Sequence, residues 1–433
     1  MIGGYRTRKY RAPNKRLGLC TALLVECQAP RHCLPTPLHK VLDRPESRDQ
    51  RLVMPTSDAR LPGRSTLTLH TVSTQCPTNF MDTIVPKALK RGDKIAFISP
   101  SARLNDILPT HLARGKAYLE SLGFGVQIIF SSQTTSTIAE SIRVRCEEIH
   151  TAFQDNTIAA IICTIGGSHA NELLPFLDYS LIRANPKIFV GYSDTTFLHY
   201  AIQSRAGLRT FYGPSVLTDF SDFPSPMQFT IDHFLRVLTN PGILVGPLPR
   251  SPICSKEHSD FLFGREMLDK PREITDSPSW RWLRRGQATG HLYGGTISCV
   301  VRLQGTNYAP ASWKNKILFL ESAMGDNMRL PYSVSRFRNN LVDLALSGVL
   351  HDICGLVVGR GYKYDAHMQD ELASVIEEVF DVIVGLGREE QLPILMNVDF
   401  GHTSPFLTLP IDALVRLDSD LDEFSVLEPG VRA

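Results

Sequence analysis

The residues with the clearest chemical potential lie in a segment that reads as a buried strand turning through a serine into a helix. Apolar residues 188–190 predict the strand, Gly191 ends it, and apolar residues return at helical spacing over 197–201, shortly after Ser193. Such a turn lifts the hydroxyl above the carboxyl edge of a sheet and leaves backbone N–H groups that can hold an oxyanion. Ser193 is therefore a candidate nucleophile, although the local pattern alone is more typical of a serine that caps a helix.

Two further strand ends carry the partners that a nucleophilic serine needs. The apolar run 316–320 ends in Glu321, and His402 follows a glycine shortly after the partly apolar run 395–398. A serine needs a base to take its proton, and the base needs a carboxylate that fixes its tautomer. Singly, Glu321 would be read as a solvated charge and His402 as a turn residue. Together with Ser193 they predict a catalytic triad.

Strands and helices alternate in the part of the chain that must position Ser193. Short apolar runs separated by amphipathic helices predict a parallel sheet that is covered on both faces. The expected strands are 94–98, 125–130, 159–165 and 188–190, and the expected helices lie near 112–122 and 138–153. Ligands of such sheets bind at the carboxyl ends of the strands, where Ser99, Gly166 and Ser193 are all expected.

A second domain is expected to carry the other two residues. Residues 221–289 are rich in Pro, Ser and charge and read as a linker or lid between domains at 84–220 and 290–430. The predicted fold class is α/β: a Rossmann-like N-terminal parallel α/β sandwich, followed by a C-terminal β-rich α/β domain. Because Glu321 and His402 fall in the second domain, the active site is expected at the domain interface.

Several motifs recur in one order along residues 84–430. They are Ser99-Pro100-Ser101, Gly166-Gly167 with Asn171-Glu172-Leu173-Leu174-Pro175, Gly191-Tyr192-Ser193-Asp194, Gly294-Gly295, Leu320-Glu321 and Asp399-Phe400-Gly401-His402. In this combination the chain resembles the LD-carboxypeptidase family and, within it, is most similar to the microcin C self-immunity peptidases. It departs from the family pattern at Thr296, where an asparagine is usual, and at Asp412, where a glycine is usual.

The resemblance assigns roles residue by residue. It places the nucleophile at Ser193, the acidic triad member at Glu321 and the general base at His402. It also implies an oxyanion hole built from the backbone N–H groups of Gly167 and Asp194. A triad of this kind implies a serine-type carboxypeptidase that needs no cofactor and no metal.

The resemblance also implies the substrate class and the assembly. The substrate would be a small LD-peptide of murein or an aminoacyl or peptidyl nucleotide, and the protein would be a homodimer. Trp280 and Trp282 lie where self-immunity peptidases stack a tryptophan on the nucleotide, although both could equally anchor the lid to the body. Arg143, Arg145 and Arg360 are open candidates for holding a substrate carboxylate.

Composition narrows the class of protein. Hydrophobic residues make up 43% and charged residues 21% of the 433 residues, as in a soluble globular protein, and no apolar run is long enough to span a membrane. Nine cysteines without zinc-like spacing indicate reduced thiols in an intracellular protein. Residues 1–80 contain 13 Lys and Arg against 5 Asp and Glu, a net charge of +8, so the remainder carries −6 of the whole-chain +2. An acidic body argues against nucleic acid as a partner.

The N-terminal segment 1–80 has many arginines and prolines and no sustained periodicity, which predicts a disordered basic extension or leader. A basic start followed by a short apolar run could be a mitochondrial presequence, although serine is scarce there. Translation from Met81 is the plainer alternative. The expected location is cytoplasmic, or mitochondrial if the basic segment is a genuine presequence.

Two rival functions share the predicted fold. A nucleotide- or peptide-binding relative without turnover would have no need of a Ser/Glu/His set, and hydrolysis that survives Ser193→Ala would expose it. An amidase for another small metabolite would use the same mechanism and differ only in its pocket. The sequence does not separate this amidase from the carboxypeptidase.

Overall fold

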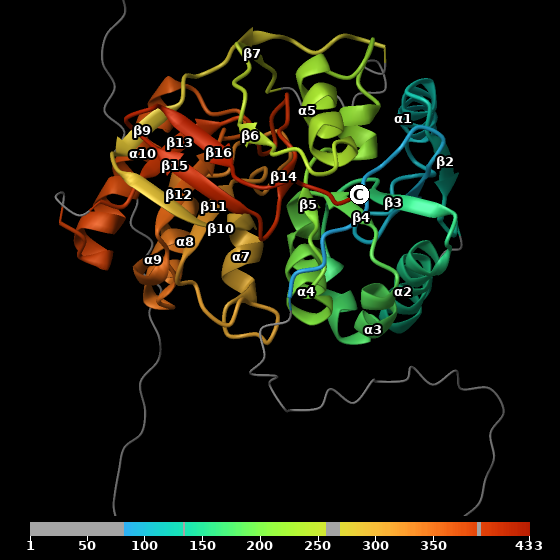
Figure 1. Cartoon of the computed structure of the whole chain (residues 1–433). Helices are drawn as coiled ribbons and strands as arrows, with labels where there is room; N and C mark the ends of the chain where they lie inside the picture. Colours follow the sequence, from blue (N-terminus) through green and yellow to red (C-terminus); the bar gives the residue numbers. More distant parts are fainter. Residues whose placement is uncertain (1–81, 133–134, 257–268, 388–390) are drawn as a thin grey trace, which may run out of the picture. The chain divides into compact units, whose positions relative to one another are not determined.

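A six-stranded sheet forms the first part of the computed structural model, which describes residues 82–132, 135–256, 269–387 and 391–433 (Figure 1). In spatial order its strands are β14 (Leu409–Pro410), β5 (Phe211–Tyr212), β4 (Ile188–Gly191), β3 (Ile158–Cys163), β1 (Lys94–Ile98) and β2 (Gly125–Ile128). All neighbours pair in parallel except β14, which is antiparallel to β5. Strands β1, β3 and β4 are almost wholly apolar and buried, as a sheet with two covered faces requires.

Helices cover both faces of this sheet. They are α1 (Pro109–Ser121), α2 (Ile138–Gln154), α3 (Tyr179–Ala184), α4 (Thr196–Ala206) and α5 (Gln228–Thr239), with short helical turns η1 (Ala170–Phe176), η2 (Ser193–Thr195) and η3 (Val216–Phe220). In Figure 1, α2, α3 and α4 lie below the strands, whereas α1 and α5 lie above them. The predicted parallel α/β domain is therefore confirmed.

An eight-stranded sheet forms the second part. In spatial order its strands are β6 (Gly246–Pro247), β16 (Glu423–Val426), β15 (Leu414–Asp418), β10 (Gln287–Thr296), β11 (Lys316–Glu321), β12 (Gly355–Gly359), β13 (Ile394–Val398) and β9 (Arg281–Arg284). The central strands β10 to β13 are parallel, and antiparallel strands flank them on both sides. This arrangement confirms the predicted β-rich C-terminal domain.

The helices of the second part alternate with its strands along the chain. They are α7 (Ile297–Leu303), α8 (Val334–Leu346), α9 (Val349–Asp352) and α10 (Ala366–Glu378), which continues into the π-helical turn η5 (Val379–Val384). Helix α10 and the turn η5 are contiguous, because η5 begins at the residue after Glu378. Helix α8 packs against both α7 and α10.

The predicted linker, residues 221–289, contributes ordered elements to the fold. It contains α5, the edge strands β6 and β9 of the second sheet, and a small ladder of β7 (Ile253–Cys254) with β8 (Thr275–Asp276). The two sheets also share chain segments, because β14 comes from the C-terminal part yet pairs with β5 of the first sheet. Helix α4 packs on α7 and β10, and the buried apolar residues of both sheets belong to one continuous core.

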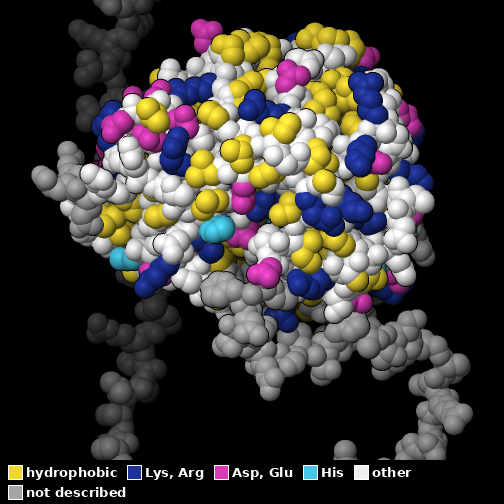
Figure 2. Space-filling model, in the orientation of Figure 1, with side chains coloured by type: hydrophobic (Ala, Val, Ile, Leu, Met, Phe, Trp, Pro, Cys, Tyr) yellow, Lys and Arg dark blue, Asp and Glu magenta, His cyan; other side chains and the backbone are white. Residues whose placement is uncertain are grey.

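Charged side chains of both signs are interspersed with apolar ones on the face shown in Figure 2. No helix in the described ranges is both long and apolar enough to cross a bilayer. Within the same ranges, no group of three or more His, Cys, Asp or Glu side chains is placed to hold a metal ion. The predicted N-terminal extension, 1–80, lies outside the described residues.

Candidate active site

Ser193 lies at the tip of the turn that leads from β4 into α4. Its backbone φ is +65°, a left-handed conformation that is uncommon for a residue with a side chain and costs free energy at such a turn. The turn is completed by η2, which begins at Ser193, and α4 starts at Thr196. The predicted strand-to-helix turn is therefore present, and its strained residue is the candidate nucleophile.

The three predicted triad residues meet through hydrogen bonds. His402 Nε2 lies 3.0 Å from Ser193 Oγ, and His402 Nδ1 lies 2.7 Å from Glu321 Oε2. Glu321 is fully buried and His402 is 2% exposed, so water screens their attraction little. Ser193 and His402 are 209 positions apart in the sequence, yet their side chains are within hydrogen-bond distance, as a nucleophile and its base must be.

Two further side chains hold the carboxylate of Glu321. The Tyr212 hydroxyl donates to Glu321 Oε1 at 2.7 Å, and the Thr296 hydroxyl donates to the same oxygen. Burial alone would raise the pKa of Glu321, but the neighbouring His402 and the hydrogen bonds from His402, Thr296 and Tyr212 outweigh burial and lower it. The carboxylate is therefore kept ionised inside the core.

Tyr212 also touches the nucleophile turn. Its hydroxyl accepts a hydrogen bond from the Ser193 N–H at 3.1 Å, so one side chain of β5 links the backbone of Ser193 with the carboxylate of Glu321. Sequence reasoning missed Tyr212 altogether. It noted Thr296 only as a departure from the family pattern, and the structure shows that the hydroxyl at this position reaches Glu321.

The glycines at 166 and 167 permit close approach to the nucleophile turn. A Cβ on Gly166 would lie 2.6 Å from Ser193 Cβ, and a Cβ on Gly167, whose φ is +132°, would lie 2.5 Å from Ala102 Cβ. Both positions therefore require glycine. Among the described residues the Gly167 N–H has no hydrogen-bond partner, which leaves it available to a ligand.

The carboxylate of Asp194 ties the two turns together. It accepts hydrogen bonds from Ser101 Oγ at 2.5 Å and from the Ala170 N–H at 2.9 Å, and it is buried. The segment that follows Gly167 is thereby fixed to the segment that follows Ser193. The predicted oxyanion groups, the N–H of Gly167 and that of Asp194, belong to these two segments.

The loop that carries His402 is anchored from below by Arg360. This guanidinium donates to Thr403 Oγ1 at 3.1 Å, to Asp399 Oδ1 at 3.1 Å and to the Pro405 carbonyl. Arg360 is 2% exposed. Arg360 therefore holds the loop on both sides of the histidine. The sequence left Arg360 open as a candidate for binding a substrate carboxylate, and in the structure its carboxylate partner is Asp399.

The two predicted tryptophans make contacts within the protein. Trp280 is buried, its Nε1–H donates to Asp399 Oδ2 at 2.9 Å, and the Arg250 guanidinium lies 4.1 Å above its ring. Trp282, in β9, donates to Asp422 Oδ1 at 2.7 Å. These contacts agree with the anchoring alternative, and stacking on a substrate stays a prediction.

Comparisons with known proteins agree with this architecture. Residues 95–213 match the LD-carboxypeptidase N-terminal domain, and residues 289–417 match the LD-carboxypeptidase C-terminal domain. Among curated proteins, the Escherichia coli microcin C7 self-immunity protein MccF is 30% identical over 78% of this chain and 94% of its own length. A Bacillus subtilis protein named "probable murein peptide carboxypeptidase" is 29% identical over 80% of this chain and 95% of its own.

Solved structures give the same result. The crystal structure of an MccF-like protein from Bacillus anthracis superposes with a TM-score of 0.68 at 31% identity, covering 80% of this chain and all of that one. MccF in complex with aspartyl sulfamoyl adenosine superposes with a TM-score of 0.70 at 28% identity, covering 80% and 99% of the two chains. The chain therefore belongs to the LD-carboxypeptidase family, peptidase family S66.

Proposed function

We propose that the protein is a serine-type carboxypeptidase whose triad is Ser193, His402 and Glu321. The observation that carries the proposal is the continuous line of hydrogen bonds from Ser193 Oγ through both nitrogens of His402 to a buried, ionised Glu321. A side chain needed only to cap α4 would have no use for a buried imidazole and carboxylate aligned behind it.

Each residue has a chemical task in the proposed reaction. His402 Nε2 takes the proton of Ser193 Oγ while that oxygen attacks the amide carbonyl, and the Gly167 and Asp194 N–H groups hold the oxyanion. The imidazolium, stabilised by Glu321, gives its proton to the departing amine, which leaves an ester on Ser193. A water molecule, deprotonated in turn by His402, then hydrolyses the ester and frees the acid.

The relatives suggest which amide is cleaved. A solved structure holds MccF with aspartyl sulfamoyl adenosine, and a Bacillus subtilis relative is named for murein peptides. We propose that the substrate is one of these two classes, an aminoacyl or peptidyl nucleotide or an LD-peptide of murein, and that the role is detoxification or murein peptide processing.

The family resemblance also leads us to propose a cytoplasmic homodimer. Light scattering after gel filtration tests the dimer against the monomer mass of 48.3 kDa.

The test is hydrolysis of an LD-tetrapeptide and of aspartyl sulfamoyl adenosine, followed by mass spectrometry. Ser193→Ala is expected to lower the rate by about 10⁴-fold or more because the remaining site keeps only binding and oxyanion stabilisation. Ser204→Ala, in the helix that follows the nucleophile, is the matched control and should keep the wild-type rate. Hydrolysis that persists in Ser193→Ala would contradict the proposal, and binding of either compound without turnover by wild type would favour a non-catalytic relative.

A further inference from the structure

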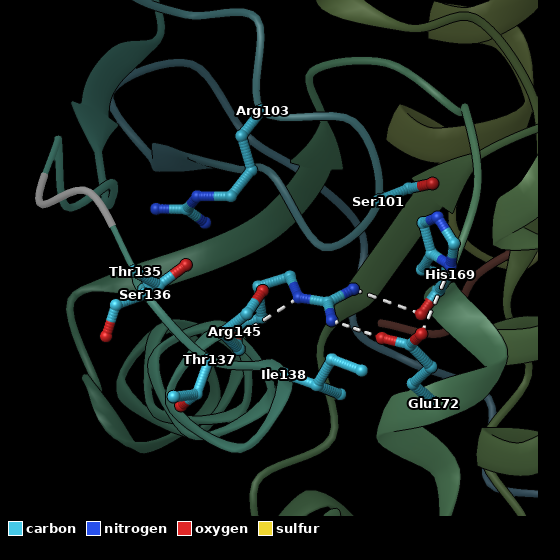
Figure 3. Close-up of a pocket in the computed structure, with 10 residues that line it drawn as sticks. Ser101, Arg103, Thr135, Ser136, Thr137, Ile138, Arg145, His169 and Glu172 are labelled. Atoms are coloured by element: carbon cyan, nitrogen blue, oxygen red, sulfur yellow. Dashed lines mark hydrogen bonds and ion pairs between the residues drawn. The ribbon is translucent and has the colours of Figure 1, made fainter.

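A pocket of about 360 Å³ lies in the N-terminal domain, and no triad residue lines it. Figure 3 shows its wall, with Arg145 reaching from α2 toward Glu172 and toward the backbone of His169. The pocket adjoins the nucleophile turn, because the hydroxyl of its lining residue Ser101 is bonded to the carboxylate of Asp194. One side chain of the pocket wall is thus bonded to the residue that follows Ser193.

One guanidinium of the wall comes from the loop after β1. Arg103 is held by Glu148 through two contacts of 2.8 Å, and it donates to the carbonyls of Ser99 and Ser131. These bonds, within the described chain, leave its Nε–H for another acceptor. The Arg103 side chain is 20% exposed and lies 4.3 Å above the ring of Phe130, so it is both accessible and rigidly placed.

A second guanidinium comes from α2. Arg145 donates to the carbonyls of Ser141, Pro100 and His169 and pairs with Glu172 at 2.8 Å. One Nη2 proton is left after these bonds are counted over the residues that the structure describes. A buried guanidinium has already lost its hydration water when the protein folds. Because its hydrogen bonds also fix its position, it needs no reorganisation when an anion binds.

The other two arginines that the sequence singled out do not line this pocket. Arg143 projects from the exposed side of α2 and pairs with Glu147 at 2.7 Å, and Arg360 is enclosed beneath the His402 loop. Of the three, Arg145 is the one that lines this pocket. The rest of the wall is mainly hydroxyl-bearing, including Ser101 and Thr135.

We propose that this pocket binds a carboxylate of the amino-acid unit next to the scissile bond. This inference rests on the proposed function and deepens it. Arg103 is paired with Glu148 and Arg145 with Glu172, and each guanidinium keeps an N–H for a further acceptor. These N–H groups and the hydroxyls of the wall suit a planar carboxylate, and the volume accommodates an amino-acid unit. The carboxylate can be the free terminus of the released residue or the acidic side chain of the acyl part, such as the aspartyl and glutamyl groups bound by MccF.

The first experiment measures binding in the Ser193→Ala background, where turnover is blocked. Two matched pairs of ligands are titrated by calorimetry: an LD-tetrapeptide with a free or an amidated C-terminus, and aspartyl or asparaginyl sulfamoyl adenosine. Arg103→Gln is expected to weaken the carboxylate member of one pair about tenfold and its neutral partner less than twofold. The pair that responds identifies which carboxylate the pocket holds. Arg143→Gln, on α2 but outside the pocket, should change neither pair.

A second pair of variants avoids the risk that Arg103→Gln disturbs the fold by leaving Glu148 without its partner. Thr135 lines the rim and is partly exposed, so a charge there is tolerated. Thr135→Lys should tighten binding of the carboxylate ligand, and Thr135→Asp should weaken it, each by a factor of about three to ten. The affinity for the neutral ligands should stay the same in both variants.

Equal responses of the acidic and neutral ligands to these variants, or no binding of either pair, would overturn the pocket assignment. The outcome is separable from failure of the proposed function. Loss of the pocket assignment leaves hydrolysis by wild type and its absence in Ser193→Ala untouched. Hydrolysis that survives in Ser193→Ala contradicts the triad instead, and mass spectrometry of the titrated samples detects it as product.

Discussion

At the scale of single residues, the ionised state of Glu321 is the feature on which the rest depends. A fully buried carboxylate would ordinarily become protonated, and here His402, Thr296 and Tyr212 hold it in the charged form. Tyr212 has the widest reach, because its hydroxyl also accepts from the Ser193 N–H. We regard it as a positioning residue for both ends of the proposed triad.

Tyr212→Phe is expected to raise the pKa of Glu321, because a donor to the charged form is lost. A carboxyl whose folded-state pKa is lowered contributes stability above its ordinary value of 4.5, and this contribution is lost as the pH falls through the lowered value. In the variant the folded-state pKa lies closer to the ordinary value, so the loss should be smaller and should end at a higher pH. Melting temperatures followed between about pH 3 and 7 test this shift, which reports the ionisation of Glu321.

The control for this shift is Tyr118→Phe, a partly exposed tyrosine on α1 remote from Glu321. Thr296→Val should shift the acid limb of the curve of melting temperature against pH in the same direction as Tyr212→Phe, since it removes the second donor to Glu321 Oε1. If the acid limb of Tyr212→Phe coincided with that of wild type, Tyr212 would not be holding the ionised carboxylate.

At the scale of elements, the site is made by turns that approach one another more closely than side chains normally allow. The turn after β3 passes the turn after β4 at Gly166, and the loop after β13 is held around His402 by Arg360. Each turn follows a strand of a parallel run, so strand ends from both sheets supply the reacting groups.

Gly166→Ala should displace Ser193 without unfolding the domain. The added methyl would lie 2.6 Å from Ser193 Cβ and 2.9 Å from its Oγ, so the hydroxyl must move away from His402. A displacement of this size is expected to lower kcat/KM about 100-fold or more. Gly387→Ala, where an added Cβ meets nothing within 4 Å, is the matched control. Full activity of Gly166→Ala would show that the two turns are not closely fitted.

At the scale of the whole molecule, the sequence predicted what is local and missed what is formed across the chain. Ser193, Glu321 and His402 each follow an apolar run that ends abruptly, and such runs can be read one at a time. The contact of Tyr212 with Glu321 joins two sheets over 109 positions, so no local pattern reveals it. The same is true of β14, a two-residue strand that returns to the first sheet.

The predicted linker, residues 221–289, shows why domain boundaries are harder to predict from the sequence than single helices and strands. Its Pro-, Ser- and charge-rich composition resembles a loop, yet β6 and β9 within it pair with strands far away in sequence. Pairing at a sheet edge needs few apolar residues, because only one side of the strand is covered. The tryptophans were ambiguous for a related reason: an indole can pack against its own protein or against a ligand with the same chemistry.

The most direct test of the proposed triad is covalent labelling with a fluorophosphonate, read by intact mass and peptide mapping. Wild-type protein should gain one adduct, on Ser193, and Ser193→Ala should gain none. His402→Ala should label far more slowly, because the serine then has no base. An adduct at another residue, no adduct at all, or labelling of Ser193 at the same rate without His402 would contradict the proposed nucleophile and its base.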